Sequence, residues 1–384
     1  MKFKKVKLPI NVCFLIVVLV ILIIPVLSIN KDVISEEENR TLTKYKSIYN
    51  KENKTINTTY CKDFENWFKD RFFGRLFLIH INNNIKYFLS GRFVRYKEVI
   101  IDKNNEIMYG TLQVSAIPTA DQNKIRNKLQ SLNEYLKKQN IKLYVVVVPQ
   151  KETIYPPILN RRPKSINNIK SVIVDKNYGV NMIFAANEYM DSKKILKYPL
   201  FFKTDSHETD DGVFVSYNTL MKEIQKDFHD IYISRSSDFY YIYNNLTMYS
   251  DKRVFRLGHT CITAAGLPKS ICYNLHNAEY RYYVHRDIKN LKIKSYKSDK
   301  LEKEEYFYPK GNNLRCLLIG DSFMDNLMDV MSYSFKHCMK IHLRYFLDNQ
   351  ILKNEIDEFK PDIVVIYIRY GGSYTRLEDF TVPN

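Results

Sequence analysis

The sequence predicts an α/β fold in which a mostly parallel sheet is flanked by helices. The main observation is a series of short apolar runs rich in β-branched residues, of which residues 142–149 and 314–319 are the clearest. Strands of a parallel sheet are buried on both faces and therefore appear as such continuous runs. Helical patterns separate the runs, and this strand–helix–strand order favours parallel pairing with helices on both faces. The composition, 45% hydrophobic and 26% charged, excludes disordered, collagen-like and coiled-coil chains.

The N-terminus predicts a transmembrane anchor. Residues 8–29 carry no charge and, as a helix rising about 1.5 Å per residue, are long enough to cross about 30 Å of hydrocarbon. Four lysines precede this segment: Lys2, Lys4, Lys5 and Lys7. By the positive-inside rule they keep the N-terminus in the cytoplasm, so the chain from about residue 30 lies outside it, in the periplasm or at the cell surface. The alternative is a cleaved signal peptide, with Val26 and Ser28 at the cleavage site.

Three parts are expected along the chain. Residues 1–29 form the basic stub and the anchor, residues 30–60 a polar linker or surface arm, and residues 61–384 the extracytoplasmic domain. Aromatic residues at helical spacing predict an amphipathic helix within 61–90 whose apolar face packs on a core. They are Phe64, Trp67, Phe68 and Phe72, followed by Leu76. Residues 230–310 break the strand–helix rhythm and are expected to be an insertion of short strands and loops.

Helices and strands alternate from Ala120 onward. Asp121 is placed to cap a helix that runs to about Gln139. Further helices are expected up to about Phe228 and near 323–336 and 349–359, and strands at 142–149, 314–319, 339–343 and 362–368.

Charge and cysteine content restrict the partners. The net charge of +17 favours anionic partners such as acidic polymers, lipid headgroups or nucleic acid, although the many Lys, Asn and Tyr residues also reflect an AT-rich genome. Five of the six cysteines lie outside the apolar segment and show no metal-type spacing. Cys261 and Cys272 are a candidate disulfide in an oxidising compartment, and two unlinked thiols are the alternative.

The first chemical motif is Gly320-Asp321-Ser322-Phe323, between a predicted strand and a predicted helix. Catalytic groups of open α/β sheets gather at the carboxyl ends of the strands, so Ser322 is expected at the sheet edge. Its backbone N–H, near a helix start, would face a developing oxyanion. A helix N-cap is the alternative reading of the tripeptide.

The second motif is Asp205-Ser206-His207-Glu208, ahead of a predicted helix that contains Gly212. In an extended segment, residues two apart point to the same side, so the Asp205 carboxylate can orient the imidazole of His207. The other ring nitrogen would then accept a proton from Ser322. An acidic N-cap with a solvated histidine is one alternative. A metal site formed by Asp205, His207 and Glu208 is the other, and the lack of further His or Cys ligands disfavours it.

Five motifs in register give a family resemblance. They are residues 35–42 (SEEENRTL), residues 148–156 (VPQKETIYP), Asp205-Ser206-His207 with Gly212, Gly320-Asp321-Ser322-Phe323, and Arg344-Tyr345. In this order, behind one anchor, the chain resembles the SGNH-hydrolase-like acetyltransferases of the alginate O-acetylation type, the DHHW family. The resemblance implies an SGNH-like fold and covers nearly the whole extracytoplasmic part. Glu208 departs from it, because the family commonly has Trp after the histidine.

The resemblance also implies roles for these residues. Ser322 would be the nucleophile, His207 the general base and acid, and Asp205 its orienting partner. The substrate-binding candidates are Arg344, Tyr345, Tyr155 and Lys151, with a salt bridge as the alternative for Arg344 and a β-turn role for Tyr155 and Lys151. No metal, other cofactor or nucleic-acid partner is expected.

The leading hypothesis is an O-acetyltransferase that moves acetyl onto hydroxyls of an extracellular or periplasmic polysaccharide through an acetyl-serine intermediate. Acetyl-CoA is absent outside the cytoplasm, and the resemblance implies a membrane-bound O-acyltransferase as the donor relay. A carbohydrate acetylesterase with the same triad is the second hypothesis, because water as acceptor needs the same groups. A non-catalytic glycan-binding or assembly scaffold is the third.

Overall fold

The chain forms two compact units, residues 1–97 with 259–274 and residues 98–258 with 275–384. The computed structural model describes residues 9–12, 14–15, 18–19, 29–35, 40–50, 54–89, 94–96, 99–102, 107–109, 119–155, 179–202, 206–243, 281–298, 301–343, 349–371, 374 and 377. Within these ranges no helix has the length and apolar character needed to cross a membrane. Residues 20–28 of the predicted anchor lie outside them, so the anchor stays a prediction.

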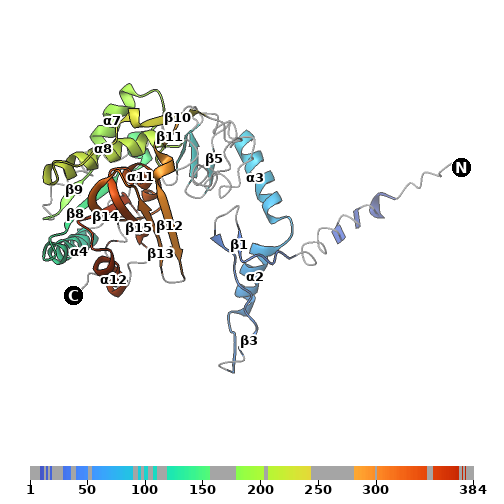
Figure 1. Cartoon of the computed structure of the whole chain (residues 1–384). Helices are drawn as coiled ribbons and strands as arrows, with labels where there is room; N and C mark the ends of the chain where they lie inside the picture. The colour runs from blue at the N-terminus through green and yellow to red at the C-terminus, as the bar shows by residue number, and fades with distance from the viewer. Residues whose placement is uncertain are drawn as a thin grey trace. The chain divides into compact units, whose positions relative to one another are not determined.

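The second unit is built on a seven-stranded sheet in the order β12-β13-β15-β14-β16-β8-β9 (Figure 1). The strands are β8 (Lys142–Val148), β9 (Asn181–Ile183), β12 (Lys292–Lys297), β13 (Glu302–Phe307), β14 (Asn312–Gly320), β15 (Phe335–His342) and β16 (Ile363–Arg369). The five strands from β15 to β9 pair in parallel, whereas β13 and β12 add an antiparallel edge beside β15. The predicted α/β fold with a mostly parallel sheet is confirmed.

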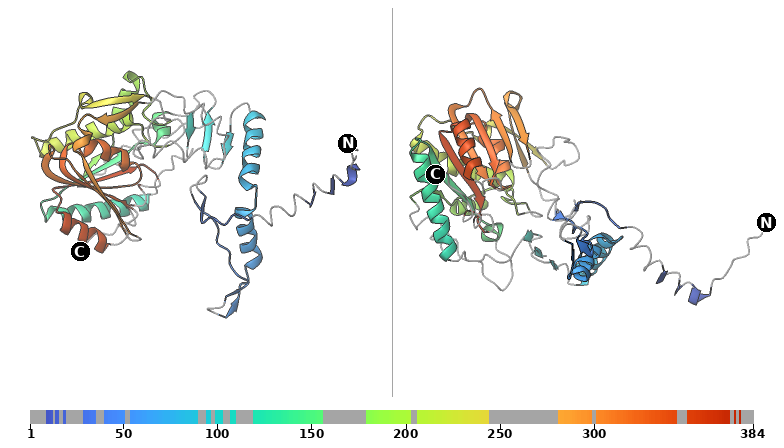
Figure 2. Two further views of the ribbon diagram at one scale, coloured as in Figure 1. Left: turned by 45° about the vertical axis from the view of Figure 1, so that its right-hand side comes forward. Right: turned by 90° about the horizontal axis from the view of Figure 1, so that it is seen from below.

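Helices cover both faces of this sheet (Figures 1 and 2). One face packs on α4 (Thr119–Lys137) and α12 (Asn349–Phe359). The other packs on α7 (Ala186–Ile195), α8 (Asp210–Asp227) and α11 (Met324–Met331). Successive side chains of a strand point to opposite faces, and β14 divides its residues in this way: Leu317 and Ile319 join the first core, Cys316 and Leu318 the second.

Two cysteines lie side by side inside the sheet. Cys316 of β14 and Cys338 of β15 are partners in the parallel register, and both are buried free thiols. Burial raises the pKa of the Cys316 thiol well above its ordinary value. The predicted pair Cys261 and Cys272 lies outside the described residues.

Two differences from the expected elements concern β15 and the expected insertion at 230–310. Helix α11 ends at Met331 and β15 begins at Phe335, so this strand starts four residues before the expected 339. Within the expected insertion, β12 and β13 belong to the main sheet, while β10 (Phe239–Tyr243) and β11 (Arg281–His285) form a separate antiparallel pair. The edge strand β12 and its neighbour β13 read KIKSYK and EKEEYF, and such charged sequences lack the apolar pattern that marks a buried strand.

The short elements complete the second unit. They are β6 (Val99–Asp102) and β7 (Ile107–Tyr109), which form an antiparallel pair, α5 (Lys151–Ile154), and two 3₁₀ turns, η1 (Ser236–Asp238) and η2 (Ile288–Asn290).

Two helices of the first unit occupy the stretch near residues 61–90 where one was expected. These are α2 (Tyr60–Arg71) and α3 (Arg75–Leu89), separated at Gly74, whose φ of +77° few other residues adopt. The predicted aromatic stripe lies on α2, where Phe64 contacts Trp67 with ring centroids 5.6 Å apart. Phe64 is 40% exposed, so this face is only partly buried.

The end of α2 holds the segment that was expected to be a linker. The buried Arg71 guanidinium donates to the carbonyl oxygens of Asn30, Asp32 and Thr43, each at 2.8 Å. The strands of this unit are β1 (Ile34–Ser35) with β2 (Arg40–Thr41), β3 (Tyr49–Asn50) with β4 (Thr55–Ile56), and β5 (Val94–Tyr96).

Candidate active site

The carboxyl ends of the parallel strands meet at one edge of the sheet. Gly320 at the end of β14 lies opposite Tyr367 of β16 on one side and His342 of β15 on the other. Gly320 is needed there, because a Cβ would lie 2.2 Å from the carbonyl oxygen of Tyr367. This close approach places the turn that follows β14 directly beside the end of β16.

The turn that carries Ser322 is fixed by its neighbour Asp321. The buried Asp321 carboxylate accepts the backbone N–H of Phe323 at 3.0 Å and that of Arg369, at the end of β16, at 3.4 Å. Phe323 is the residue that precedes α11, so Ser322 is not the N-cap of this helix. The serine hydroxyl is therefore held on a short, tied turn at the sheet edge.

The loop that carries His207 is closed by backbone hydrogen bonds. The N–H of Phe202 donates to the carbonyl of His207 at 3.1 Å, and the N–H of Thr209 donates to that of Leu200 at 3.0 Å. Thr209 also caps α8, because its hydroxyl accepts the N–H of Gly212 at 3.3 Å and donates to the carbonyl of Pro199 at 2.7 Å. The cap of α8 is thus Thr209, and His207 stands just ahead of it.

Ser322 and His207 are in direct contact. The Nε2 atom of His207 lies 2.7 Å from Oγ of Ser322, although the two residues are 115 positions apart in the sequence. The imidazole stacks on the ring of Phe323, with centroids 4.4 Å apart and planes at 27°. A hydroxyl within hydrogen-bond reach of an oriented imidazole is the arrangement that activates a serine nucleophile.

The other predicted site residues are placed as follows. Asp205, Arg344 and Tyr345 lie outside the described residues, so their roles stay predictions. Lys151 is buried, and its Nζ donates to the carbonyl of Phe202 at 3.0 Å. The Tyr155 hydroxyl accepts the N–H of Leu200 at 3.1 Å. Both side chains thus support the backbone that leads to His207, and their substrate-binding role stays a prediction.

The sequence did not indicate that Glu208 belongs to the interior of the site. Its carboxyl group is buried and accepts the hydroxyls of Tyr367 at 2.7 Å and Ser216 at 3.1 Å. Burial raises the pKa of Glu208 to about 8, and the nearby charge of Asp321 acts in the same direction. The one sequence feature that could have drawn attention to Glu208 is that the family commonly has Trp at this position.

The raised pKa predicts a pH dependence of stability that a Glu208→Gln variant removes. The folded state keeps the proton up to about pH 8, whereas the unfolded chain loses it near 4.5, so this carboxyl lowers the free energy of unfolding as the pH rises between the two. One pKa unit corresponds to about 1.4 kcal/mol. In urea unfolding, the variant should gain stability over the parent by about 1–4 kcal/mol between pH 5 and pH 8. The exposed Glu188→Gln on α7 is the control, and an equal difference at both pH values contradicts the prediction.

Gly212 sets how closely α8 approaches the His207 loop. A Cβ at this position would lie 2.1 Å from the carbonyl oxygen of Leu200. Gly212→Ala should therefore lower the free energy of unfolding by about 1–3 kcal/mol, despite the better helix propensity of alanine. Urea unfolding measures this, with the exposed Asn187→Ala of α7 as a control expected to stay within about 0.5 kcal/mol. A Gly212→Ala variant as stable as the parent would contradict the prediction, because the backbone at Leu200 would then move away from the new Cβ without loss of stability.

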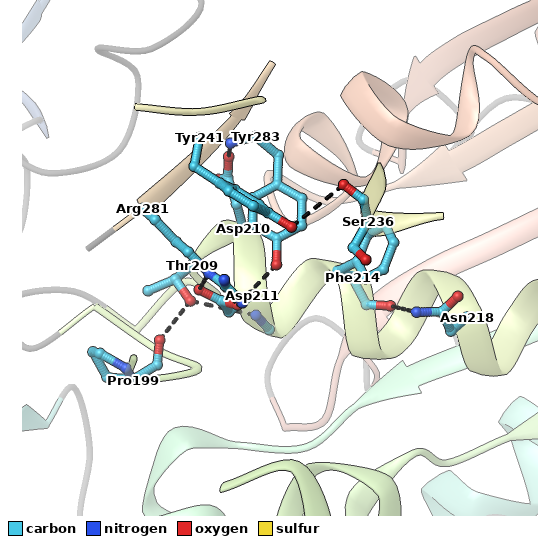
Figure 3. A network of polar contacts seen from close by, with 11 residues as sticks. Pro199, Thr209, Asp210, Asp211, Phe214, Asn218, Ser236, Tyr241, Arg281 and Tyr283 are labelled. Carbon is cyan, nitrogen blue, oxygen red and sulfur yellow. Dashed lines mark hydrogen bonds and ion pairs between the residues drawn. The ribbon is translucent and has the colours of Figure 1, made fainter. Parts of the chain in front are cut away.

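The start of α8 is also tied to strand β11 by a buried ion pair (Figure 3). The Arg281 guanidinium donates through Nε to both oxygens of Asp211 at 2.9 Å. The Tyr283 hydroxyl donates to the same carboxylate at 2.9 Å, and the backbone N–H of Tyr283 donates to Asp210 at 2.7 Å. Arg281 also lies against the rings of three tyrosines, Tyr198, Tyr241 and Tyr283. This network anchors the helix whose first residues follow His207.

Comparisons with known proteins agree with this fold. Residues 111–238, which include His207 and end before Ser322, match the family model described as SGNH hydrolase-like domain, acetyltransferase AlgX. Bacillus cereus PatB1 with a sulfonyl adduct has a TM-score of 0.55 at 15% identity, covering 74% of this chain and 97% of that chain. A DHHW family protein from Eubacterium siraeum has a TM-score of 0.56 at 13% identity, covering 76% and 98%. No curated protein matches the sequence. The resemblance predicted from the sequence is therefore confirmed: the chain resembles the SGNH hydrolase-like acetyltransferases of the AlgX type, and its fold is similar to that of a DHHW family protein.

Proposed function

We propose that this chain is an O-acetyltransferase that moves acetyl groups onto hydroxyls of an extracytoplasmic polysaccharide through an acetyl-Ser322 intermediate. The observation that carries the proposal is the 2.7 Å contact between Oγ of Ser322 and Nε2 of His207. The match to an acetyltransferase family model over residues 111–238 supports acetyl as the group that is transferred.

The reaction follows from this contact in two steps. In the first, His207 takes the hydroxyl proton while Oγ of Ser322 attacks the acetyl carbonyl, and the imidazolium then protonates the donor's leaving oxygen. In the second, His207 takes a proton from an acceptor hydroxyl as its oxygen attacks the carbonyl of acetyl-Ser322, and the imidazolium then returns that proton to Oγ as the acetyl–Oγ bond breaks. Asp205 is our candidate for orienting His207, and the backbone N–H of Ser322 is our candidate for the oxyanion donor.

The donor and the location are part of the same proposal. Residues 8–29 would anchor the chain in the cell membrane, with the catalytic unit on the extracytoplasmic side. A membrane-bound O-acyltransferase would then bring the acetyl group across the membrane. Arg344 and Tyr345, together with Tyr155 and Lys151, are the candidates for contacts with the substrate.

Detection of the acyl-enzyme tests the nucleophile. The full chain in detergent is incubated with a chromogenic acetyl ester, quenched in acid and digested for mass spectrometry, and we expect acetylation of the peptide that contains Ser322. The description of PatB1 names a sulfonyl adduct, and sulfonyl halides react with activated nucleophiles, so a sulfonyl fluoride should modify the same peptide and block acetylation. Modification elsewhere, with Ser322 intact, would overturn the mechanism.

The acceptor separates transferase from esterase. With glycan present, a transferase should place acetyl on the glycan and release less free acetate, whereas an esterase releases acetate at a rate that glycan does not change. A scaffold is a third possibility, and it predicts that Ser322→Ala leaves the acetylation of the cell's polymer unchanged.

A further inference from the structure

Large apolar side chains are exposed along one side of helix α3. Positions 77, 81, 85 and 89 follow one another at intervals of four, and residues at that spacing share one face of a helix. Their exposed fractions run from 39% for Ile81 to 83% for Leu89. Two further exposed residues extend this side, one within the helix and one just before it. We call the whole set the α3 face: Phe73, Phe77, Leu78, Ile81, Ile85 and Leu89.

The α3 face is more than the first unit needs for its own packing. Leu76 and Ile79 of the same helix are half-buried, so α3 already turns other apolar residues inward. Single exposed apolar residues are ordinary, but a continuous stripe of large ones marks a surface that contacts a membrane or another protein.

The first residue after the predicted anchor is fixed beside the start of this face. The backbone N–H of Asn30 donates to the carbonyl of Arg71 at 2.8 Å, and the Arg71 guanidinium donates back to the carbonyl of Asn30 at 2.8 Å. Asn30 also lines a cavity of about 280 Å³ that Phe73 and Phe77 line as well. If residues 8–29 cross the membrane, the α3 face therefore begins at the point where the chain leaves the bilayer.

The charge of this part of the chain distinguishes a lipid surface from a second copy. Residues 76–97 contain four lysines and arginines and no aspartate or glutamate. Helices that lie on membranes combine an apolar face with such a basic surplus, because lysine and arginine are attracted to anionic headgroups. A second copy of the same stretch would bring the same positive charge and be repelled. Charge complementarity thus favours an anionic bilayer.

The length of α3 decides how it would meet the bilayer. With 15 residues at about 1.5 Å each it is about 22 Å long, shorter than the roughly 30 Å of hydrocarbon. It suits a position along the surface, where apolar faces enter the boundary between headgroups and acyl chains. Resting on the membrane anchor proposed above, we infer that α3 lies on the extracytoplasmic leaflet with the α3 face among the acyl chains. This second contact holds the first unit against the bilayer.

Quenching by brominated lipids tests the contact. Trp67 is the only tryptophan of the chain, so Trp67→Phe removes the intrinsic signal. Three reporters are then introduced singly: Ile81→Trp on the α3 face, Leu19→Trp in the predicted anchor, and the exposed Glu188→Trp on α7 as the aqueous reference. The full-length chains are reconstituted in nanodiscs of phosphatidylglycerol and phosphatidylcholine with brominated acyl chains. We expect bromine to quench Ile81→Trp at least about twice as strongly as Glu188→Trp.

The anchor reporter separates failure of this inference from failure of the proposed location. If Leu19→Trp is quenched but Ile81→Trp no more than Glu188→Trp, the anchor stands and the inference is overturned. If neither Leu19→Trp nor Ile81→Trp exceeds the reference, the proposed location fails and the inference fails with it. Quenching of Ile81→Trp alone would support the membrane contact and contradict the anchor.

A change to the face itself tests whether its apolar side chains make the contact. Adding Phe77→Ser and Ile85→Ser to the Ile81→Trp chain should lower the quenching about twofold or more, because burial of apolar surface drives interfacial binding. Asn82→Ser, at an exposed polar position of the same helix, is the matched control and should leave the quenching unchanged. Quenching that survives the loss of both apolar side chains would overturn the assignment. Shielding of Ile81→Trp from aqueous acrylamide without quenching by bromine would also overturn it and would indicate a protein partner, such as a second copy.

Discussion

Ser322→Ala is expected to lower acetyl transfer by about 10³–10⁶-fold, because in the proposed mechanism it removes the atom that would form the acyl-enzyme. The substitution also removes one hydrogen bond, the contact of 2.7 Å with His207, so the free energy of unfolding should change by only about 0.5–1.5 kcal/mol. Release of the chromogenic leaving group measures the activity, and urea unfolding measures the stability.

A matched serine separates loss of the nucleophile from a general disturbance of α11. Ser332 follows this helix and is fully buried, whereas Ser322 is half-buried, and within the described part of the chain the Ser332 Oγ has no hydrogen-bond partner. Ser332→Ala should therefore retain activity within about twofold of the parent. If Ser322→Ala retained more than about a tenth of the activity, or if Ser332→Ala lost as much as Ser322→Ala, the nucleophile would have to be sought elsewhere.

The largest effect on stability is expected for Asp211→Ala. The Asp211 side chain is 1% exposed and Arg281 18%, so the substitution leaves an unpaired guanidinium charge in a largely buried place. Removing one partner of a buried ion pair lowers the free energy of unfolding by about 3–5 kcal/mol. Urea unfolding at pH 7 should show this loss.

Two further variants test whether the cost comes from the unpaired charge. Asp191→Asn breaks an exposed ion pair with Lys194 on α7, and we expect a change below about 0.5 kcal/mol. A double variant, Asp211→Leu with Arg281→Met, removes both charges and should recover most of the stability lost in Asp211→Ala. A double variant as unstable as Asp211→Ala would instead assign the loss to packing among the tyrosines.

The central strands were predictable because strands buried on both faces consist almost entirely of apolar residues. Residues 142–148 and 363–369 are apolar at nearly every position, as required of strands covered by helices on both faces. Strand β13 begins with four charged residues and owes its place to its pairing with β15, which no local pattern predicts. Local patterns therefore predicted four of the five parallel strands and missed both β9 and the antiparallel part of the sheet.

The candidate site was predictable only in part for a related reason. The position of Ser322 at the sheet edge follows from the strand that precedes it, whereas its meeting with His207 was predicted from the roles that a Ser-His-Asp triad requires and from motifs of a known family. The burial of Glu208 depends on Tyr367, which is 159 positions away, and the partner of Asp211 is 70 positions away. Pairings over such distances are decided by tertiary packing, so the composition around each residue does not reveal them.

The two adjacent cysteines within the sheet have a consequence for their own reactivity. The thiols of Cys316 and Cys338 are shielded by the helical layers, and the raised pKa of Cys316 keeps it in the unreactive, protonated form. Oxidants and alkylating reagents act on exposed thiolates. Both buried thiols are therefore expected to react slowly with oxidants and alkylating reagents in the surrounding medium.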